Sequence, residues 1–67
     1  MYKSFYVTVL NKANKRSVIG TDCGTLEFAT LMARGERECS KRTVFVREYE
    51  QAGWAGQRKL VQEHAVA

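Results

Sequence analysis

The chain has 67 residues, enough for one small domain but too few for a second hydrophobic core. A hydrophobic fraction of 45% and a charged fraction of 27% are ordinary for a folded protein, which argues against an intrinsically disordered chain. The formal net charge of +4 favours acidic partners, including nucleic acid, although such an excess also keeps many small proteins soluble. We therefore expect a single domain over residues 1–67.

Targeting signals are not evident in the sequence. Residues 1–10 (MYKSFYVTVL) lack the long apolar run of a signal peptide, and no segment is apolar enough to span a bilayer. We expect a cytoplasmic protein with no membrane partner.

The first third of the chain predicts two strands joined by a turn. Residues 4–10 (SFYVTVL) are rich in β-branched and aromatic side chains, as is typical of a strand. The polar segment 11–16 (NKANKR) is typical of a turn. Residues 17–21 (SVIGT) would return as a shorter strand, weakened or bulged by Gly20.

An amphipathic helix is expected to begin near residue 25. Asp22 and Thr25 are both suitable N-caps, and Glu27 would lie in the first turn, where the helix dipole favours negative charge. Gly35 inside the helix costs ~1 kcal/mol relative to alanine, so it indicates a close backbone contact or the start of fraying. Apolar side chains recur at helical spacing and are expected to pack in the core, namely Leu26, Phe28, Ala29, Leu31, Met32 and Ala33.

The last third predicts a strand, a loop and an ambiguous tail. Residues 43–50 (TVFVREYE) alternate as a strand does, with Phe45 and Tyr49 on one face and two valines on the other, and either face could be buried. The glycine-bracketed segment 51–56 is a loop. The tail 57–64 fits a strand that closes a hairpin or a short helix, and we prefer the strand. The fold class is therefore α+β, in the order β-β-α-β-β, with the helix packed on one face of an antiparallel sheet.

Catalytic and metal-binding patterns are missing from the sequence. His64 is the only histidine and lies near the tail, and Cys23 has no histidine close in sequence to act as its base. Cys23 and Cys39 should lie roughly 20 Å apart along the helix, well beyond the ~7 Å limit for a disulfide. Neither a zinc-ligand spacing nor a nucleotide-binding loop is present. We expect a protein without enzymatic activity, cofactor or metal.

Two groups of basic residues are candidates for partner binding. Helical spacing places Arg34, Arg37 and Lys41 on one exposed face. The helix dipole favours cations near the C-terminus by ~0.3–1 kcal/mol each, and Arg34 could pair with Glu38. Alternatively, both groups of basic residues bind phosphates or an acidic protein surface. Trp54, in the loop AGWAG, is a candidate interface anchor, or else a lid over the sheet. The basic residues are Lys12, Lys15 and Arg16 in the first loop, and Arg34, Arg37, Lys41 and Arg42 along and after the helix.

Two segments carry a resemblance to a known group. TLEFATLMARGEREC at 25–39 and TVFVREYEQAG at 43–53 resemble small phage-encoded inhibitors of host machinery, such as type I-F anti-CRISPR proteins. The resemblance implies a compact β/α fold and inhibition by binding to a host protein or protein–nucleic-acid complex in the host cytoplasm. It would give that binding role to Arg34, Arg37 and Lys41.

Three hypotheses about function follow. The leading one is a small inhibitor or adaptor, encoded by a phage or mobile element, that binds a protein partner through the basic helix face. The second is direct binding of nucleic acid by the same basic residues. The third is self-association through an unpaired strand edge, which would give a homodimer.

Overall fold

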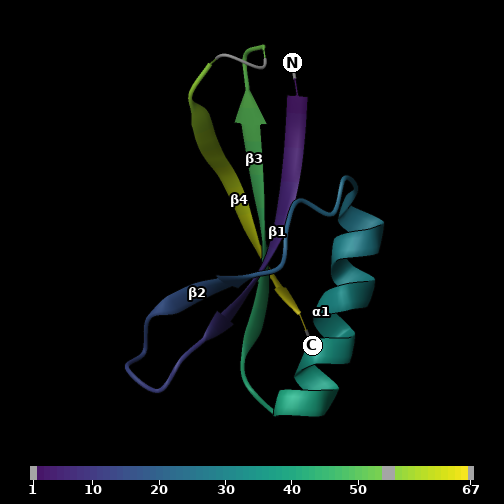
Figure 1. Ribbon diagram of the computed structural model, residues 1–67, viewed down its shortest axis with the longest axis vertical. Helices are drawn as coiled ribbons and strands as arrows, with labels where there is room; N and C mark the ends of the chain where they lie inside the picture. The colour runs from purple at the N-terminus through teal and green to yellow at the C-terminus, as the bar shows by residue number, and fades with distance from the viewer. Residues whose placement is uncertain (1, 54–55, 67) are drawn as a thin grey trace.

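The computed structural model describes residues 2–53 and 56–66 (Figure 1). In this part of the chain, the strands form one antiparallel sheet in the order β2-β1-β3-β4, and the helix packs on one of its faces. The α+β fold predicted from the sequence is confirmed, and the ambiguous tail is a strand. The elements are β1 (Tyr2–Leu10), β2 (Arg16–Ile19), α1 (Leu26–Ser40), β3 (Val44–Gln51) and β4 (Arg58–Val66).

The hydrophobic core lies between α1 and the two central strands. In the register of β1 and β3, Val7 lies opposite Val46 and Val9 opposite Val44, so the four valines share one face of the sheet. Val44 and Val46 are fully buried, and Phe5 extends the same cluster along β1. The valine side of the third strand is therefore the side that faces the helix.

The helix packs on this cluster through its smallest side chains. Ala29 and Ala33 are fully buried, whereas Phe28 and Met32 are 50% and 51% exposed. The expectation that Leu26, Phe28 and Met32 build the core is therefore wrong. Alanines one turn apart let the helix backbone approach the valine face closely, and this leaves the larger side chains along the flanks of the helix. Leu31 also lies outside the core.

Local hydrogen bonds set the start of α1. Thr25 is the N-cap, and its side chain accepts a hydrogen bond from the backbone N–H of Phe28 at 3.2 Å. Asp22 has a different role: its carboxylate accepts from the backbone N–H groups of Phe5 and Gly24, at 3.0 and 2.9 Å. These bonds tie the loop before the helix to β1.

The end of α1 involves a lysine in the left-handed region. The helix continues past Gly35 to Ser40, and a methyl group on Gly35 would meet no atom within 4 Å, so neither explanation offered for this glycine holds. Lys41 is the C-cap, with φ +60°, and its N–H donates to the carbonyl of Arg37 at 2.9 Å.

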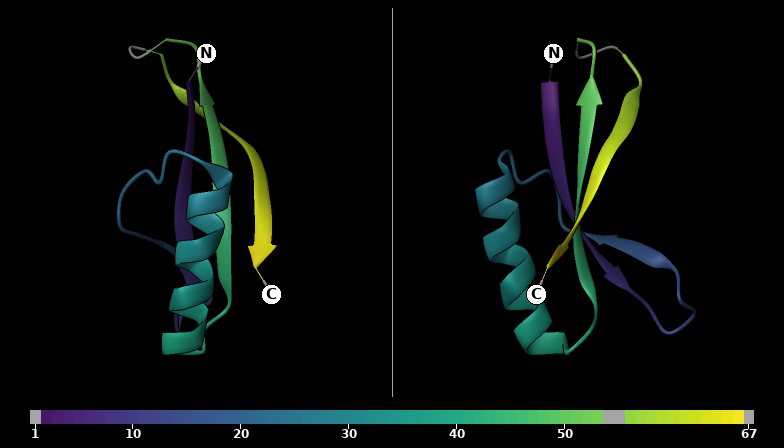
Figure 2. Two further views of the ribbon diagram at one scale, coloured as in Figure 1. Left: turned by 90° about the vertical axis from the view of Figure 1, so that its right-hand side faces the viewer. Right: turned by 180° about the vertical axis from the view of Figure 1, so that it is seen from behind.

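The helix covers only part of its face of the sheet. Figure 2 shows β1, β3 and β4 extending past the N-terminal end of α1. Charged side chains occupy helix-side positions on this extension, where Lys3 Nζ lies 3.5 Å from Glu48 Oε2. The Nε2 atom of His64, which lies opposite Val46 on β4, is 3.1 Å from Glu48 Oε1. The hydrogen bond from His64 lowers the pKa of Glu48, and the positive charge of Lys3 contributes to the same shift.

Candidate functional site: the exposed surface of the helix

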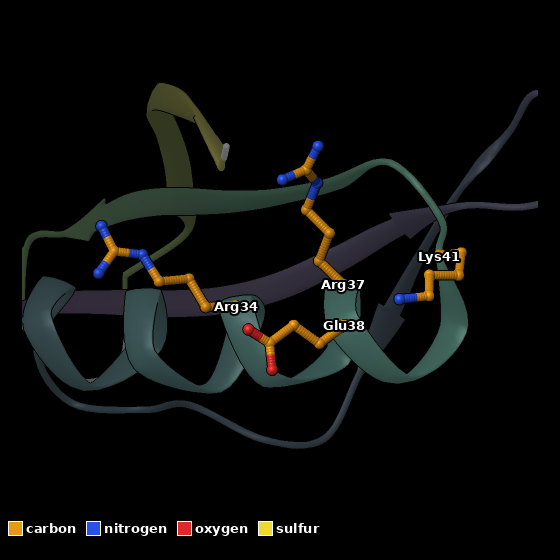
Figure 3. A pocket seen from close by; sticks show the side chains of 4 residues that line it. All are labelled: Arg34, Arg37, Glu38 and Lys41. Atoms are coloured by element: carbon orange, nitrogen blue, oxygen red, sulfur yellow. The ribbon is translucent and has the colours of Figure 1, made fainter.

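Three cations and one carboxylate from α1 and its C-cap line a shallow hollow. Figure 3 shows the side chains of Arg34, Arg37, Glu38 and Lys41 around it. All four residues are exposed. The grouping of Arg34, Arg37 and Lys41 on one face agrees with their spacing in the sequence. The structure gives each of them access to solvent.

The cations of this hollow have no carboxylate partner within 4.0 Å among the described residues. The expected pairing of Arg34 with Glu38 is not made: in Figure 3 the Arg34 side chain extends towards the start of the helix, and its guanidinium lies away from the Glu38 carboxylate. In contrast, the sheet cations Lys3 and Arg47 contact carboxylates. The helix therefore presents positive charge that the rest of the described chain does not neutralise.

An apolar hollow continues this surface towards the N-terminus of α1. Leu26, Thr30 and Leu31 line it together with Glu27, and Arg34 borders both hollows. Leu31 is 65% exposed. The two hollows together form a band that runs from apolar to basic along the helix. At 1.5 Å per residue, a band from residue 26 to residue 41 is roughly 22 Å long. We call it the helix band.

A separate groove lies on the opposite flank of α1. Phe28 and Met32 line it from the helix, and Ile19 and Cys23 line it from the segment that leads into the helix. Burial raises the pKa of the Cys23 thiol, and the neighbouring Asp22 carboxylate raises it further. A raised pKa disfavours the thiolate form that a nucleophilic cysteine requires.

The structure separates the basic residues of the first loop from those of the helix. Lys12 and Lys15 lie on the β1–β2 turn, which the views of Figures 1 and 2 place on the other side of the sheet from α1. Arg16 is already engaged, since its Nε lies 2.9 Å from Glu63 Oε2. Arg42 follows the helix and is exposed, and its N–H donates to Ser40 Oγ at 3.3 Å. The predicted anchor Trp54 lies outside the described residues.

A cluster on the helix-free face of the sheet was missed by sequence reasoning. Arg58 of β4 lies over the rings of Tyr6 and Tyr49, with its guanidinium carbon 5.1 and 5.3 Å from the two ring centroids. The two rings meet edge to face, with centroids 5.7 Å apart. The alternating pattern of residues 43–50 placed Tyr49 on a face but did not predict its neighbours.

A second cluster on this face joins the two edges of the sheet. Glu63 of β4 accepts hydrogen bonds from the Nε atoms of Arg16 and Arg47, at 3.1 and 3.0 Å. The guanidinium of Arg16 also lies 4.7 Å from the ring centroid of Phe45. Burial opposes ionisation of Glu63, but the hydrogen bonds from the two arginines outweigh it and lower the pKa of the carboxyl. Thr8 is fully buried on the same face.

Comparisons with protein-family models, with curated proteins and with solved structures found no match for this chain. Within residues 2–53 and 56–66, no helix is long and apolar enough to cross a bilayer. The same residues contain no cluster of three or more His, Cys, Asp or Glu side chains arranged to hold a metal ion. The charge and shape of the exposed surfaces are therefore the basis for inferring function.

Proposed function

We propose that the chain is a small non-enzymatic binding protein that attaches to an acidic protein surface through the helix band. The observation that carries the proposal is the position of Arg34, Arg37 and Lys41, which line one hollow without a carboxylate partner in the described chain. Exposed Leu26 and Leu31 continue the same surface. Charged and apolar groups are thus available to one partner.

The apolar half of the band favours a protein partner over nucleic acid. Phosphates are held by cations and polar donors, and they gain nothing from an exposed leucine such as Leu31. Glu38 within the basic hollow would also repel a phosphate. Protein interfaces, in contrast, combine apolar side chains at the centre with arginine and a polar rim. We therefore place protein binding ahead of nucleic-acid binding by the same residues.

Binding would follow from charge attraction and from burial of apolar surface. Carboxylates of the partner would pair with the two guanidinium groups of Arg34 and Arg37, which form strong bidentate contacts with carboxylates. The opposite charges would also speed association at low salt. Burial of Leu26 and Leu31 against the partner would exclude water from these ion pairs and lengthen the lifetime of the complex.

The resemblance to type I-F anti-CRISPR proteins supports a more specific form of this proposal. The chain would act stoichiometrically as an inhibitor or adaptor encoded by a phage or mobile element. Its partner would be a host protein or protein–nucleic-acid complex, such as a CRISPR-type complex. By occupying an acidic surface of that complex, the helix band would prevent another component from binding there.

Charge reversal with a matched control tests the proposal. Tagged wild-type protein, Arg34→Glu/Arg37→Glu and Lys12→Glu/Lys15→Glu would be used to capture partners from a host lysate, after circular dichroism has shown that each is folded. The two double variants change net charge equally, but on opposite sides of the sheet. We expect the helix variant to lose the partner and the loop variant to keep it.

Two results would argue against the proposal. Retention of the partner by the helix variant would remove Arg34 and Arg37 from the site. Equal loss by both double variants would show that net charge, and not the helix band, causes the attraction. Titration with generic duplex DNA addresses the second hypothesis separately: binding that weakens steeply as salt rises would support nucleic-acid binding.

A further inference from the structure

Three tyrosines form a row on the face of the sheet that α1 leaves open. Tyr2 and Tyr6 lie on β1, and Tyr49 of β3 pairs with Ser4, midway between them. The three rings project from the face opposite the buried Val7, because side chains alternate along a strand. Their backbone positions are thus offset by about 7 Å along the strand direction, and the ring centroids of Tyr6 and Tyr49 lie 5.7 Å apart. β1 and β3 are the two central strands of the sheet, so the row runs along its middle.

The charge on this face is positive. The two clusters described above contain one carboxylate, that of Glu63, and three guanidinium groups, those of Arg16, Arg47 and Arg58. Glu63 engages Arg16 and Arg47, whereas the guanidinium of Arg58 lies over two aromatic rings and has no carboxylate within 4.0 Å among the described residues. Arg58 is also an exposed residue. Its guanidinium is therefore available to an anion.

We propose that this open face binds a single-stranded nucleic acid, independently of the helix band. Bases would stack on the rings of Tyr2, Tyr6 and Tyr49, and Arg58 would move from the tyrosine rings to a backbone phosphate. A four-stranded antiparallel sheet whose central strands carry aromatic side chains on its open face is a surface on which unpaired bases stack. Tyr2 is exposed, and Tyr6 and Tyr49 are half-buried beneath Arg58. The ligand is single-stranded because bases in a duplex are stacked on one another and present no free ring faces to the protein.

The arrangement suits a polymer with a flat group in every unit. The rings of Tyr6 and Tyr49 differ in orientation, but the row offers aromatic contacts at several points along one direction. Each stacked base contributes to affinity without requiring a particular sequence. The positive charge of Arg58 and its neighbours complements phosphate at each step. An acidic polypeptide would satisfy the charge but would leave the ring faces without flat partners, which places it second.

Fluorescence anisotropy with labelled oligouridine and oligothymidine measures this binding directly. Binding of either strand at low salt, with weaker binding of the same strand annealed to its complement, is the expected result. Tyr49→Leu should weaken the affinity about 5- to 150-fold, the range expected for loss of one stacked base, whereas Tyr49→Phe should bind like the wild type. Arg58→Gln should weaken binding and reduce the slope of log affinity against log salt by about 0.7.

The control is Arg34→Gln, which removes the same charge from the helix. It should leave the affinity close to that of the wild type, and an effect as large as that of Arg58→Gln would overturn the proposal. So would an absence of binding by both strands at low salt, or tighter binding of polyglutamate than of either strand. Thermal unfolding of each variant checks that a loss of affinity is not a loss of folding.

Amide chemical shifts of the isotope-labelled wild type locate the site without any substitution. Addition of oligouridine, or of oligothymidine if that strand binds more tightly, should shift resonances of β1, β3 and Arg58. Shifts confined to α1 would refute the assignment to the open face.

Discussion

Truncation of Val46 should destabilise the protein more than truncation of Phe28, although phenylalanine is the larger side chain. Val46 is fully buried against α1, and Val46→Ala removes two methyl groups, a loss of about 1.6 kcal/mol at about 0.8 kcal/mol each. The void left behind increases this loss. Phe28 is 50% exposed, so Phe28→Ala forfeits about half of the ~1.5–3 kcal/mol that full burial contributes. The higher helix propensity of alanine offsets up to ~0.7 kcal/mol of that.

Urea and thermal unfolding followed by circular dichroism measure these differences. In a domain of this size 1 kcal/mol corresponds to ~4–8 °C in Tm, so Val46→Ala should lower Tm by at least roughly 6 °C. Val18→Ala is the matched control, because it removes the same two methyl groups from a side chain that is 52% exposed on β2. If Phe28→Ala proves more destabilising than Val46→Ala, or if Val18→Ala matches Val46→Ala, the description of the core is incorrect.

Three further predictions concern the helix contact, the helix cap and the response to acid. Ala33→Leu should cost about 1–3 kcal/mol in urea unfolding, because Ala33 is fully buried and the added atoms would push α1 from the sheet; a neutral effect would contradict the close approach. Thr25→Ala should lower stability by about 0.5–2 kcal/mol in the same assay, whereas Thr25→Ser should retain most of it, since either hydroxyl serves as N-cap. Acid should destabilise the protein: the pKa values of Glu48 and Glu63 are lowered in the folded state, so the unfolded chain binds more protons and stability falls as pH drops below about 4.5. Urea midpoints across that range measure the fall, and Glu63→Gln should make it shallower.

Local patterns in the sequence were sufficient for the first four elements and their order, whereas the tail 57–64 fitted either a strand or a short helix. Alternation in residues 43–50, the turn-forming segment 11–16 and the cap at Thr25 each depend on neighbouring residues, and all three features are present in the structure. The buried side of α1 was less predictable. Sequence periodicity identifies an apolar stripe, but the side chains that enter the core depend on the distance between helix and sheet. Ala29 and Ala33 make that distance short, and Phe28 is left at the edge.

The helix band and the open face of the sheet also differ in how far they could be predicted from the sequence. Arg34, Arg37 and Lys41 could be grouped from helical spacing alone, because they lie within one continuous element. The contact of Arg58 with Tyr6 could not be foreseen, since it depends on strand order and on a register shift in the β3–β4 pairing at Tyr49. A one-residue change in register would turn every side chain of the shifted strand to the opposite face of the sheet. The side chains that meet on a surface built from several strands can therefore be identified only from the structure.

At Lys41, the residue that would give the greatest stability differs from the residue that the proposed binding requires. At φ +60° a side chain costs roughly 1–2 kcal/mol that glycine avoids, and glycine is the residue most often found at this position after a helix. A chain optimised for stability alone would carry glycine there. With lysine, the protein keeps a positive charge at the end of the helix band and accepts a strained backbone in return. Efforts to make this protein more heat-resistant would reach Lys41→Gly early, and they would weaken the proposed interface in the same step.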